Sequence, residues 1–446
     1  MKRMILTVTL LVYGCYQTDM SGDPKECQSS IECDDGDLCT FDYCEGGECA
    51  HQDICEPPPD CESAADCDDA DECTLDYCDM GSCMHEDICP EPECDPLIRM
   101  LNLDLPVSQI DMASNGGLIV LAMVGADDAA RGFVASLDPS DTETEIVIHS
   151  FVEDENQTDG LFVAWRDEEN PRLFWNSLDA SDNSKIMTAE FKDSALTNEE
   201  TVYVPDESFT IRLNDVKLGP DGIYGITAEV ASADGTPRAH FIAYSPETEI
   251  SQVSELSPRH SHLPVLAALA DGWSLGFTER NMTDGPDTVF FSQYRLPSDY
   301  ETAQVIVNQE TVFATRAMIN TSSTQIVLYE SFMTEDINQL FAGWIMEDGT
   351  PFSIDLDWQT RGVDALGSYA EERAMVSWCS PDVISEASSI RVSSLTSTSL
   401  FSTEFRADTS SLGCAKTQLV ALGTDIYIFW LSDDGMNLSM KNLSCH

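Results

Sequence analysis

Cysteines and aspartates crowd into one short stretch near the start of the chain. Residues 33–44 read CDDGDLCTFDYC, and the pattern returns at residues 67–78 as CDDADECTLDYC. Carboxylates are ligands for calcium, thiolates are ligands for zinc, and cysteines of an exported chain form disulfides. The stretch is therefore a candidate metal site, a candidate reactive centre or a disulfide framework.

The calcium hypothesis depends on eight carboxylates: Asp34, Asp35, Asp37 and Asp42, with their counterparts Asp68, Asp69, Asp71 and Asp76. Gly36 becomes Ala70 in the second copy, although the tight loop around calcium usually needs glycine, and no glutamate follows at the EF-hand position. Calcium is a candidate cofactor, and the alternative is that these aspartates cap the local backbone in turns. Zinc is disfavoured because an oxidising compartment removes its thiolates. His51 and His85 occupy equivalent places, which indicates a structural role.

The spacing of the cysteines favours disulfides. Two frameworks of the form C-x5-C-x5-C-x4-C-x4-C-x5-C follow one another, at Cys27, Cys33, Cys39, Cys44, Cys49 and Cys55 and at Cys61, Cys67, Cys73, Cys78, Cys83 and Cys89. Modules this small bury too little apolar surface to fold without cross-links. Six cysteines allow fifteen connectivities, so the sequence leaves the pairing open.

The motif D-D-G-x-x-C-T-x-D-x-C, followed by G-x-C-x-H, resembles a cysteine-rich repeat of surface lipoproteins from myxobacteria-like species. It is similar in spacing to Dickkopf-type cysteine-rich modules. The resemblance implies a disulfide-held spacer or interaction module with no chemistry of its own. The linkers at 56–60 and 90–93 are rich in proline and acidic residues, which predicts extended, stiff connections.

The N-terminus has the pattern of an export signal. Lys2 and Arg3 precede the apolar run at 4–12, and Val12-Tyr13-Gly14-Cys15 resembles the lipobox of bacterial lipoproteins. The resemblance implies cleavage before Cys15, acylation of that cysteine as a membrane anchor and, because Tyr16 follows it, sorting to the outer membrane or cell surface. The alternative is an ordinary signal peptide with a chance cysteine.

The charge of the chain excludes some classes of partner. Its 446 residues include 80 acidic and 22 basic ones, for a formal net charge of −58. Binding to nucleic acid needs clustered Lys and Arg, so nucleic acid is not an expected partner. The acidity indicates either a solvated surface suited to a saline habitat or neutralisation by divalent cations or a basic partner.

From residue 95 onward, short apolar strand patterns alternate with turn residues at a period of about fifty residues, which is typical of propeller blades. Seven such runs are predicted to be equivalent: 118–125, 161–167, 223–230, 273–280, 325–332, 373–379 and 426–433. We therefore expect an all-β fold, a β-propeller of about seven four-stranded blades. Because the runs are unevenly spaced, six- or eight-bladed rings and paired β-sandwiches remain alternatives.

The seventh unit supplies only three strands, and residues 97–105 are predicted to provide the fourth and close the ring. Antiparallel pairing would then bring Cys94 next to Cys445. Cys379 and Cys414 should also lie on one rim of the propeller. The sequence predicts both pairs as disulfides.

No catalytic residue is predicted, because no hydrolase elbow, metalloprotease helix or phosphate loop occurs in the sequence. His260 and His262, beside Arg259, are the only local histidine cluster, and this pair is interpreted as a solvated turn. Carboxylates are too abundant for any pair of them to indicate glycoside hydrolysis.

The predicted organisation is a signal peptide (1–14), a tether (15–26), two cysteine-rich repeats (27–55 and 61–89) and a propeller (95–446). The favoured function is that of a lipid-anchored surface protein that binds a protein or carbohydrate ligand through an acidic propeller. The alternative is an extracellular polysaccharide hydrolase or lyase on the same scaffold.

Overall fold

The protein is described here from a computed structural model, in which two compact units divide the chain, Met1–Pro92 and Glu93–His446. The residues that the structure describes are 27, 29, 32–36, 40–45, 47–53, 67, 74–79 and 82–87 in the first unit, and 99–103, 105–115, 117–126, 131–139, 148–150, 160–166, 170–178, 184–205, 210–231, 235–248, 250–280, 287–296, 299–300, 303–309, 313–320, 324–332, 338–346, 350–367, 373–381, 388–396, 405–410, 412–422 and 425–443 in the second. Within these ranges, no helix has the length and apolar character that a membrane span requires.

Each cysteine-rich repeat contains an antiparallel hairpin. In the first repeat β1 (Thr40–Glu45) pairs with β2 (Glu48–Asp53), and in the second β3 (Thr74–Asp79) pairs with β4 (Ser82–Asp87). The two hairpins have the same register, because Asp42 faces His51 and Asp76 faces His85. The repeats are therefore equivalent in backbone as well as in sequence.

Disulfides join the first repeat in an overlapping pattern, Cys27–Cys44 and Cys33–Cys49. The second repeat has the Cys67–Cys83 bond, which is equivalent to Cys33–Cys49. The first cysteine thus pairs with the fourth, and the second with the fifth, which settles part of the connectivity that the spacing left open. Cys39, Cys55, Cys61, Cys73 and Cys89 lie outside the described residues, and no pairing is described for Cys78.

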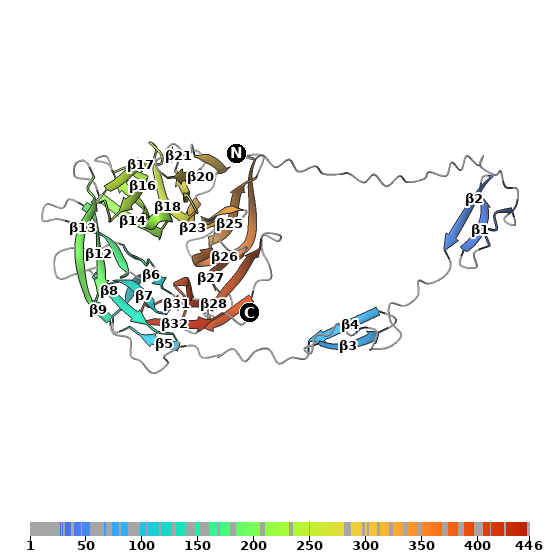
Figure 1. Ribbon diagram of the computed structural model, residues 1–446, viewed down its shortest axis with the longest axis horizontal. Helices are drawn as coiled ribbons and strands as arrows, with labels where there is room; N and C mark the ends of the chain where they lie inside the picture. The colour runs from blue at the N-terminus through green and yellow to red at the C-terminus, as the bar shows by residue number, and fades with distance from the viewer. Residues whose placement is uncertain are drawn as a thin grey trace, which may run out of the picture. The chain divides into compact units, whose positions relative to one another are not determined.

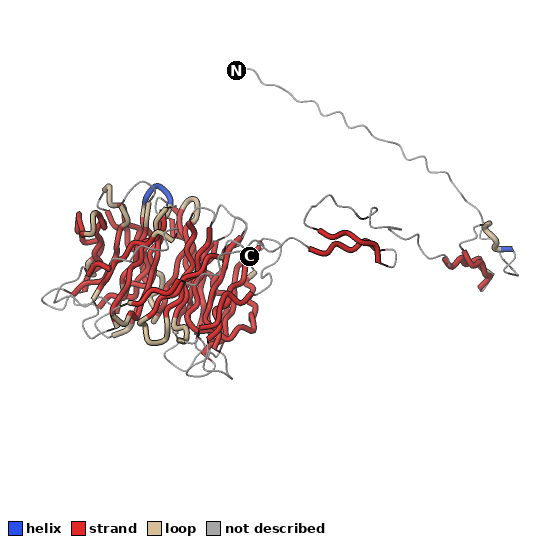
Figure 2. Tube along the Cα trace, turned by 90° about the horizontal axis from the view of Figure 1, so that it is seen from below, coloured by secondary structure: helices blue, strands red, loops and turns tan. Residues whose placement is uncertain are grey.

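The second unit is a seven-bladed β-propeller, as the strand periodicity predicts (Figure 1). The first three blades are β6 (Val107–Ser114), β7 (Ile119–Gly125), β8 (Gly132–Leu137) and β9 (Ile148–Ser150); β10 (Leu161–Ala164), β11 (Arg172–Leu178), β12 (Ser184–Lys192) and β13 (Ala195–Tyr203); and β14 (Thr210–Leu218), β15 (Tyr224–Ala231), β16 (Pro237–Ser245) and β17 (Ile250–Glu255). The 3-10 turn η3 (Pro220–Gly222) joins β14 to β15. Figure 2 shows that strands make up most of the described part of this unit.

The remaining blades repeat the pattern with small variations. The fourth is β18 (Ser261–Ala268), β19 (Gly272–Glu279) and β20 (Asp287–Arg295), with β21 (Asp299–Tyr300) and β22 (Gln304–Gln309) both paired to β20; the fifth is β23 (Phe313–Asn320), β24 (Gln325–Phe332), β25 (Asn338–Ile345) and the first part of β26 (Pro351–Gly367). The second part of β26 begins the sixth blade, with β27 (Arg373–Pro381), β28 (Ser388–Thr396) and β29 (Phe405–Ser410). One long strand therefore carries the chain from the outer edge of the fifth blade to the tunnel.

The ring closes between the two ends of the unit. The seventh blade contains β30 (Lys416–Leu422), β31 (Asp425–Leu431) and β32 (Asn437–Asn442), and β5 (Arg99–Asn102) pairs with β32 as its outer strand. This closure is the one predicted from residues 97–105. The predicted Cys94–Cys445 bond lies outside the described residues, whereas Cys379 and Cys414 form the predicted disulfide, with their Cα atoms 5.6 Å apart.

One strand assignment from the sequence is wrong. The run at 161–167 was expected to be equivalent to the second strands of the other blades, but β10 is the first strand of its blade, and β11 is the second. The second strands begin at Ile119, Arg172, Tyr224, Gly272, Gln325, Arg373 and Asp425, so successive starts differ by 48 to 53 residues. The uneven spacing in the sequence therefore came from this assignment, and the blades themselves are regular.

The core lies between the blades. All seven residues of β7 are buried, because a strand in the middle of a blade is covered by neighbouring blades on both faces. Trp273, Trp378 and Trp430, all at second-strand positions, have exposed fractions of 2% or less. Burying such side chains supplies roughly 1.5–3 kcal/mol each, which makes burial the main source of the unit's stability.

Candidate functional site

A central cavity lies where the first strands of all seven blades converge. It has a volume of about 730 Å³, and each blade contributes at least one residue to its wall: Val107, Phe162, Arg212, Leu263, Thr315, Val363 and Lys416. We call this cavity the mouth, because its walls come from the beginnings of the first strands. A second cavity of about 530 Å³ is lined by the ends of the same strands, including Met112, Leu218 and Ala421. The two cavities are therefore the two ends of one tunnel.

Charged side chains lie between these cavities, in a layer that we call the waist: Asp111, Asp215, Lys217, Asp364 and Lys416, which also lines the mouth. They come from the first strands of the first, third, sixth and seventh blades. A β-bulge directly precedes Asp215 in β14 and Asp364 in β26. Bulges re-aim the side chains of a strand, which accounts for the direction in which Asp215 and Asp364 point.

The three waist carboxylates tie neighbouring blades together. Each accepts a hydrogen bond from a backbone N–H of the next blade's first strand: Asp111 from Val163 at 2.8 Å, Asp215 from Leu266 at 3.2 Å and Asp364 from Leu419 at 2.7 Å. First strands of adjacent blades form no ladder with each other, so these N–H groups need another acceptor. The waist carboxylates therefore have a structural role.

Burial determines the electrostatics of the waist. It raises the pKa of Asp111 to about 6, although Lys217 and the Val163 N–H act in the opposite direction. Burial also raises the pKa of Asp364 and lowers that of Lys416. Burial alone would lower the pKa of Lys217, but Asp215, 3.2 Å from its Nζ, together with Asp111 and Asp364, raises it. Lys217 is therefore held in its charged form.

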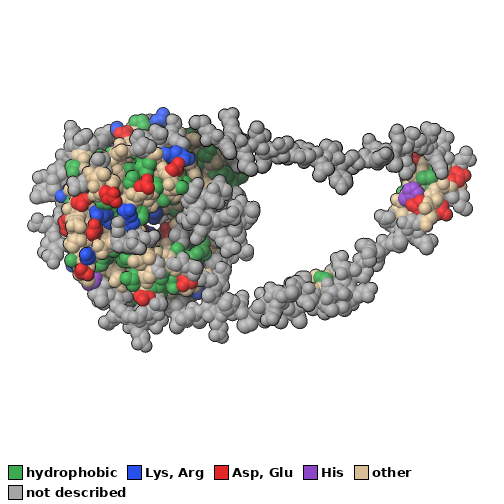
Figure 3. Space-filling model, in the orientation of Figure 1, with side chains coloured by type: hydrophobic (Ala, Val, Ile, Leu, Met, Phe, Trp, Pro, Cys, Tyr) green, Lys and Arg blue, Asp and Glu red, His purple; other side chains and the backbone are tan. Residues whose placement is uncertain are grey.

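The mouth contains one arginine, Arg212, with no described carboxylate partner. Arg212 lies on β14 and is exposed, and its cross-strand neighbour Glu229 is occupied by Asn214 and by the Leu263 N–H, 2.7 Å away. Seven described arginines lie within 4.0 Å of a carboxylate, but Arg212 does not. Figure 3 shows Lys and Arg side chains beside the central opening on the face that it draws.

Arg316 is positioned by a buried carboxylate. Its Nε lies 2.6 Å from Glu330 Oε2, and Glu330 has an exposed fraction of only 1%. Glu330 also accepts hydrogen bonds from Asn338 Nδ2 at 2.9 Å and from Thr360 Oγ1 at 2.7 Å. A fully hydrogen-bonded buried carboxylate fixes the guanidinium, so the terminal nitrogens of Arg316 are presented in a defined direction at the mouth.

The predicted histidine pair is not a solvated turn. His262 is 9% exposed, its ring lies 6.0 Å from that of His260, and burial lowers the pKa of both. Leu263, which follows, has a φ of 49° and donates its N–H to Glu229. Among the described residues these histidines form no metal-ligating group with Cys, Asp or Glu. His262 is therefore a buried residue of β18, and His260 lies partly exposed beside it.

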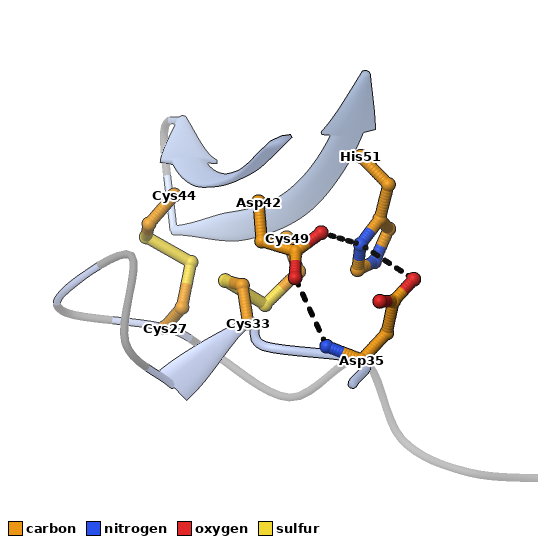
Figure 4. Close-up of a disulfide and its surroundings, with 7 residues drawn as sticks. All are labelled: Cys27, Cys33, Asp35, Asp42, Cys44, Cys49 and His51. Carbon is orange, nitrogen blue, oxygen red and sulfur yellow. Dashed lines mark hydrogen bonds and ion pairs between the residues drawn. A yellow bond between two sulfur atoms is a disulfide. The ribbon is translucent and has the colours of Figure 1, made fainter. Parts of the chain in front are cut away.

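In the first repeat, the aspartates hold the backbone (Figure 4). Asp42 accepts the Asp35 N–H at 3.0 Å and lies 2.6 Å from His51 Nδ1, and Asp34 accepts the Gly36 N–H at 2.9 Å. The hydrogen bond to His51 is the largest cause of the lowered pKa of Asp42, and the same bond raises the pKa of His51. Figure 4 shows Asp35, Asp42 and His51 facing one another beside the Cys33–Cys49 bond.

The calcium hypothesis remains a prediction. The described carboxylates of the first repeat already accept hydrogen bonds. The group Asp35, Asp42 and His51 includes a ring nitrogen, whereas calcium prefers oxygen ligands. The sulfur atoms of Cys27, Cys33 and Cys49 also lie together, but they belong to disulfides. Asp37, Asp68, Asp69 and Asp71 lie outside the described residues, and only the backbone of Asp76 is described.

The sequence contained a usable signal for the tunnel residues that it did not identify. Arg316 and Glu330 sit inside strands whose other residues are largely apolar, and Arg212 lies in the more polar first strand β14, in a chain with only 22 basic residues. A charged residue in the first or second strand of a blade must face the tunnel or a neighbouring blade. A search for charged residues in the expected first and second strands of each blade would have found these positions.

Comparison with protein families identifies the repeats. Residues 32–54 and 66–88 match the Dictyostelium (slime mold) repeat, which is cysteine-rich, in agreement with the two cysteine frameworks. The match covers a small part of the chain. No curated protein matches the sequence.

Comparison with solved structures finds propellers at low identity. An ulvan lyase, described as a polysaccharide lyase, aligns with a TM-score of 0.53 at 8% identity over 77% of this chain and 95% of its own. Hydrazine synthase from Kuenenia stuttgartiensis aligns with a TM-score of 0.50 at 12% identity over 78% and 98%. The Hadza microbial sialidase Hz136 has a TM-score of 0.47 at 10% identity over 76% of this chain, and the chain spans 65% of its length. The first two of these similarities, at 8% and 12% identity, concern the fold alone.

Proposed function

We propose that the protein is a lipid-anchored surface protein whose propeller binds an extracellular ligand, a carbohydrate or a protein, at the mouth of its tunnel. Acylated Cys15 anchors it in the outer membrane, and the two disulfide-held repeats act as a spacer. The observation that carries the proposal is the mouth itself. It has the volume typical of ligand sites, and the first, third, fifth and seventh blades supply its polar side chains.

The composition of the mouth favours binding over catalysis. A hydrolase or lyase needs a positioned acid and base. Among the described residues that line the mouth, the carboxylates are Asp433 and Asp434, both exposed, and there is no histidine, tyrosine or cysteine. The hydrogen bond from Ser432 Oγ, at 2.6 Å, is the main cause of the lowered pKa of Asp434, which makes it a weak base. The polysaccharide hydrolase or lyase therefore remains the second candidate.

The test is affinity capture from the organism's own envelope extract with the full mature chain as bait, in calcium and in chelator. Gln109→Trp would fill the mouth, and Val253→Trp, on the exposed outer strand β17, is the matched control. We expect the wild type and Val253→Trp to retain the same ligand and Gln109→Trp to lose it. Retention by all three would place binding elsewhere on the molecule and contradict the proposal.

The anchor is tested separately by mass spectrometry of the mature N-terminus. Acylation at Cys15 and release of the Cys15→Ser variant from the membrane fraction are expected. An unmodified N-terminus at any other residue would leave an ordinary exported protein.

A further inference from the structure

The wall of the mouth is rich in cations for so acidic a chain, although Arg316 is already paired with Glu330 and Lys416 lies near the waist carboxylates. The described wall contains three cations, Arg212, Arg316 and Lys416, and two carboxylates, whereas the chain has a formal net charge of −58. A chain with 80 acidic residues has an ample supply of carboxylates for its arginines, and seven described arginines use one. The unpaired Arg212 is thus an exception that needs an explanation.

Two features of Arg212 point to an external anion. Its cross-strand neighbour Glu229 accepts hydrogen bonds from Asn214 and from the Leu263 N–H at Oε1, and the described ion pairs include none between Glu229 and Arg212. It also lines a cavity wide enough for a small molecule. A guanidinium left unpaired at the wall of a concave site is suited to a planar or tetrahedral oxyanion.

Arg316 supplies the second half of the site. It lies on β23 and Arg212 on β14, so the two flank the fourth blade, whose Leu263 and Pro264 lie in the wall between them. Because Glu330 holds the Nε of Arg316, less side-chain entropy is lost when its terminal nitrogens bind a ligand. A buried carboxylate that orients a cation toward a cavity is a feature of a prepared binding site.

The rest of the wall indicates what carries the anion. Gln109 offers its amide, and Asn338 offers its amide oxygen, since its Nδ2 is bonded to Glu330. Asp433 and Asp434 offer carboxylates on the seventh blade, away from the two arginines. Hydroxyl-rich ligands need donors and acceptors of this kind. The acidic surface outside the mouth would repel a polyanion that lay along it, which favours entry of a single terminal residue.

We infer that the mouth binds an acidic saccharide residue, with its carboxylate or sulfate held by Arg212 and Arg316 and its hydroxyls met by the amide side chains and the seventh-blade carboxylates. The inference rests on the proposed function, because it names the ligand class of the same site. No bond is made or broken in this process.

The experiment is isothermal titration of the full mature chain with D-glucuronate, glucose 6-sulfate and neutral glucose, which separates the two anion types from the sugar. Binding of at least one acidic sugar and weaker binding of glucose are expected. The Arg212→Gln variant should bind the acidic sugar about tenfold more weakly or worse, since a charge-assisted hydrogen bond contributes about 1.5–3 kcal/mol. It should fold normally, because Arg212 has no described partner to abandon.

A control variant and a second test variant complete the design. Arg259→Gln, which removes an arginine outside the mouth whose side chain is 79% exposed, should leave the affinity unchanged. Arg316→Lys keeps a cation next to Glu330 but removes the guanidinium fork, so a loss of affinity with an unchanged melting temperature is expected.

Equal binding of glucose and the acidic sugars, no binding of either acidic sugar, or an unchanged affinity in Arg212→Gln would overturn the inference. Those results leave the proposed function standing if Gln109→Trp still abolishes capture of an envelope ligand. Loss of that effect as well would overturn both.

Discussion

Asp42 and Asp111 each accept a backbone N–H in a different part of the molecule, but their pKa values are shifted in opposite directions. Asp42, in the first cysteine-rich repeat, accepts the N–H of Asp35, and Asp111, in the propeller tunnel, accepts the N–H of Val163. The first lies in a small hairpin held by disulfides, and the second is 5% exposed in a unit with a continuous core. The pKa of Asp42 is lowered, mainly by the hydrogen bond with His51, and that of Asp111 is raised, by burial.

The difference teaches that the structural context of a carboxylate, and not its hydrogen bond to the backbone, determines how it responds to its surroundings. In the repeats, covalent bonds replace a core, and the Asp42 carboxylate has His51 beside it as a partner that favours its charged form. In the propeller, apolar burial holds the blades, and the carboxylates that tie neighbouring first strands lose their water. The two regions should therefore differ in their response to reduction and to pH.

The largest expected difference is the response to the loss of a disulfide. Cys33→Ser with Cys49→Ser should unfold the first repeat, because removal of a native disulfide typically abolishes folding in a domain without a core. The matched change, Cys379→Ser with Cys414→Ser, should destabilise the propeller by about 2–4 kcal/mol without unfolding it.

Limited digestion of the full chain with a glutamate-specific protease measures this difference. New cuts between residues 27 and 55 are expected in the first double variant, while the Cys67–Cys83 repeat and the propeller stay protected. Protection of the first repeat in that variant would show that it has a source of stability beyond its disulfides.

The second expected effect is the pH dependence that Asp111 gives the propeller. Its folded pKa is about 6 and its ordinary value is 3.8, so the folded state binds more protons between these values and its stability falls as pH rises through this window. The shift corresponds to about 3 kcal/mol. Asp111→Asn should remove this part of the slope, since an amide oxygen can still accept the Val163 N–H.

Urea unfolding at pH 4, 5, 6 and 7 compares wild type, Asp111→Asn and the control Asp221→Asn. Asp221 lies in the exposed turn η3 with a φ of 55°, a conformation that asparagine also adopts. The control should keep the wild-type slope. Parallel curves for all three proteins would contradict the assignment of the slope to Asp111.

Much of the fold could be predicted because its signals are local. Each blade contains apolar strands separated by turn residues, and the shortage of one strand in the seventh blade predicted its closure by the N-terminal strand, now seen in the pairing of β5 with β32. The mistaken assignment of β10 as a second strand has a physical reason. First and second strands are both covered by neighbouring blades, so LFVA, with all four residues buried, resembles a second strand.

The tunnel site could not be predicted from the sequence because it depends on the closed ring. Asp111, Lys217 and Asp364 come from three different blades and meet only around the tunnel axis. In a chain with 80 acidic residues, nothing in their local sequence distinguishes them, and the bulges before Asp215 and Asp364 redirect side chains in a way that alternation does not predict. The place of Arg212 in a first strand could be read from the sequence, but only the structure shows that it has no described carboxylate partner.

The smallest expected effect is the titration of His51, whose pKa is raised by the hydrogen bond with Asp42. The pair stabilises the repeat between the ordinary values of the two groups, 3.8 and 6.5, and the contribution is lost below that window, as Asp42 takes up a proton, and above it, as His51 releases one. NMR titration of the full chain with labelled histidines should place the His51 midpoint above 6.5. Asp42→Asn should lower that midpoint, and the control Asp34→Asn, whose carboxylate bonds the Gly36 N–H, should not. A His51 midpoint that does not change in Asp42→Asn would mean that the Asp42 carboxylate only holds the backbone, as Asp111 does in the tunnel.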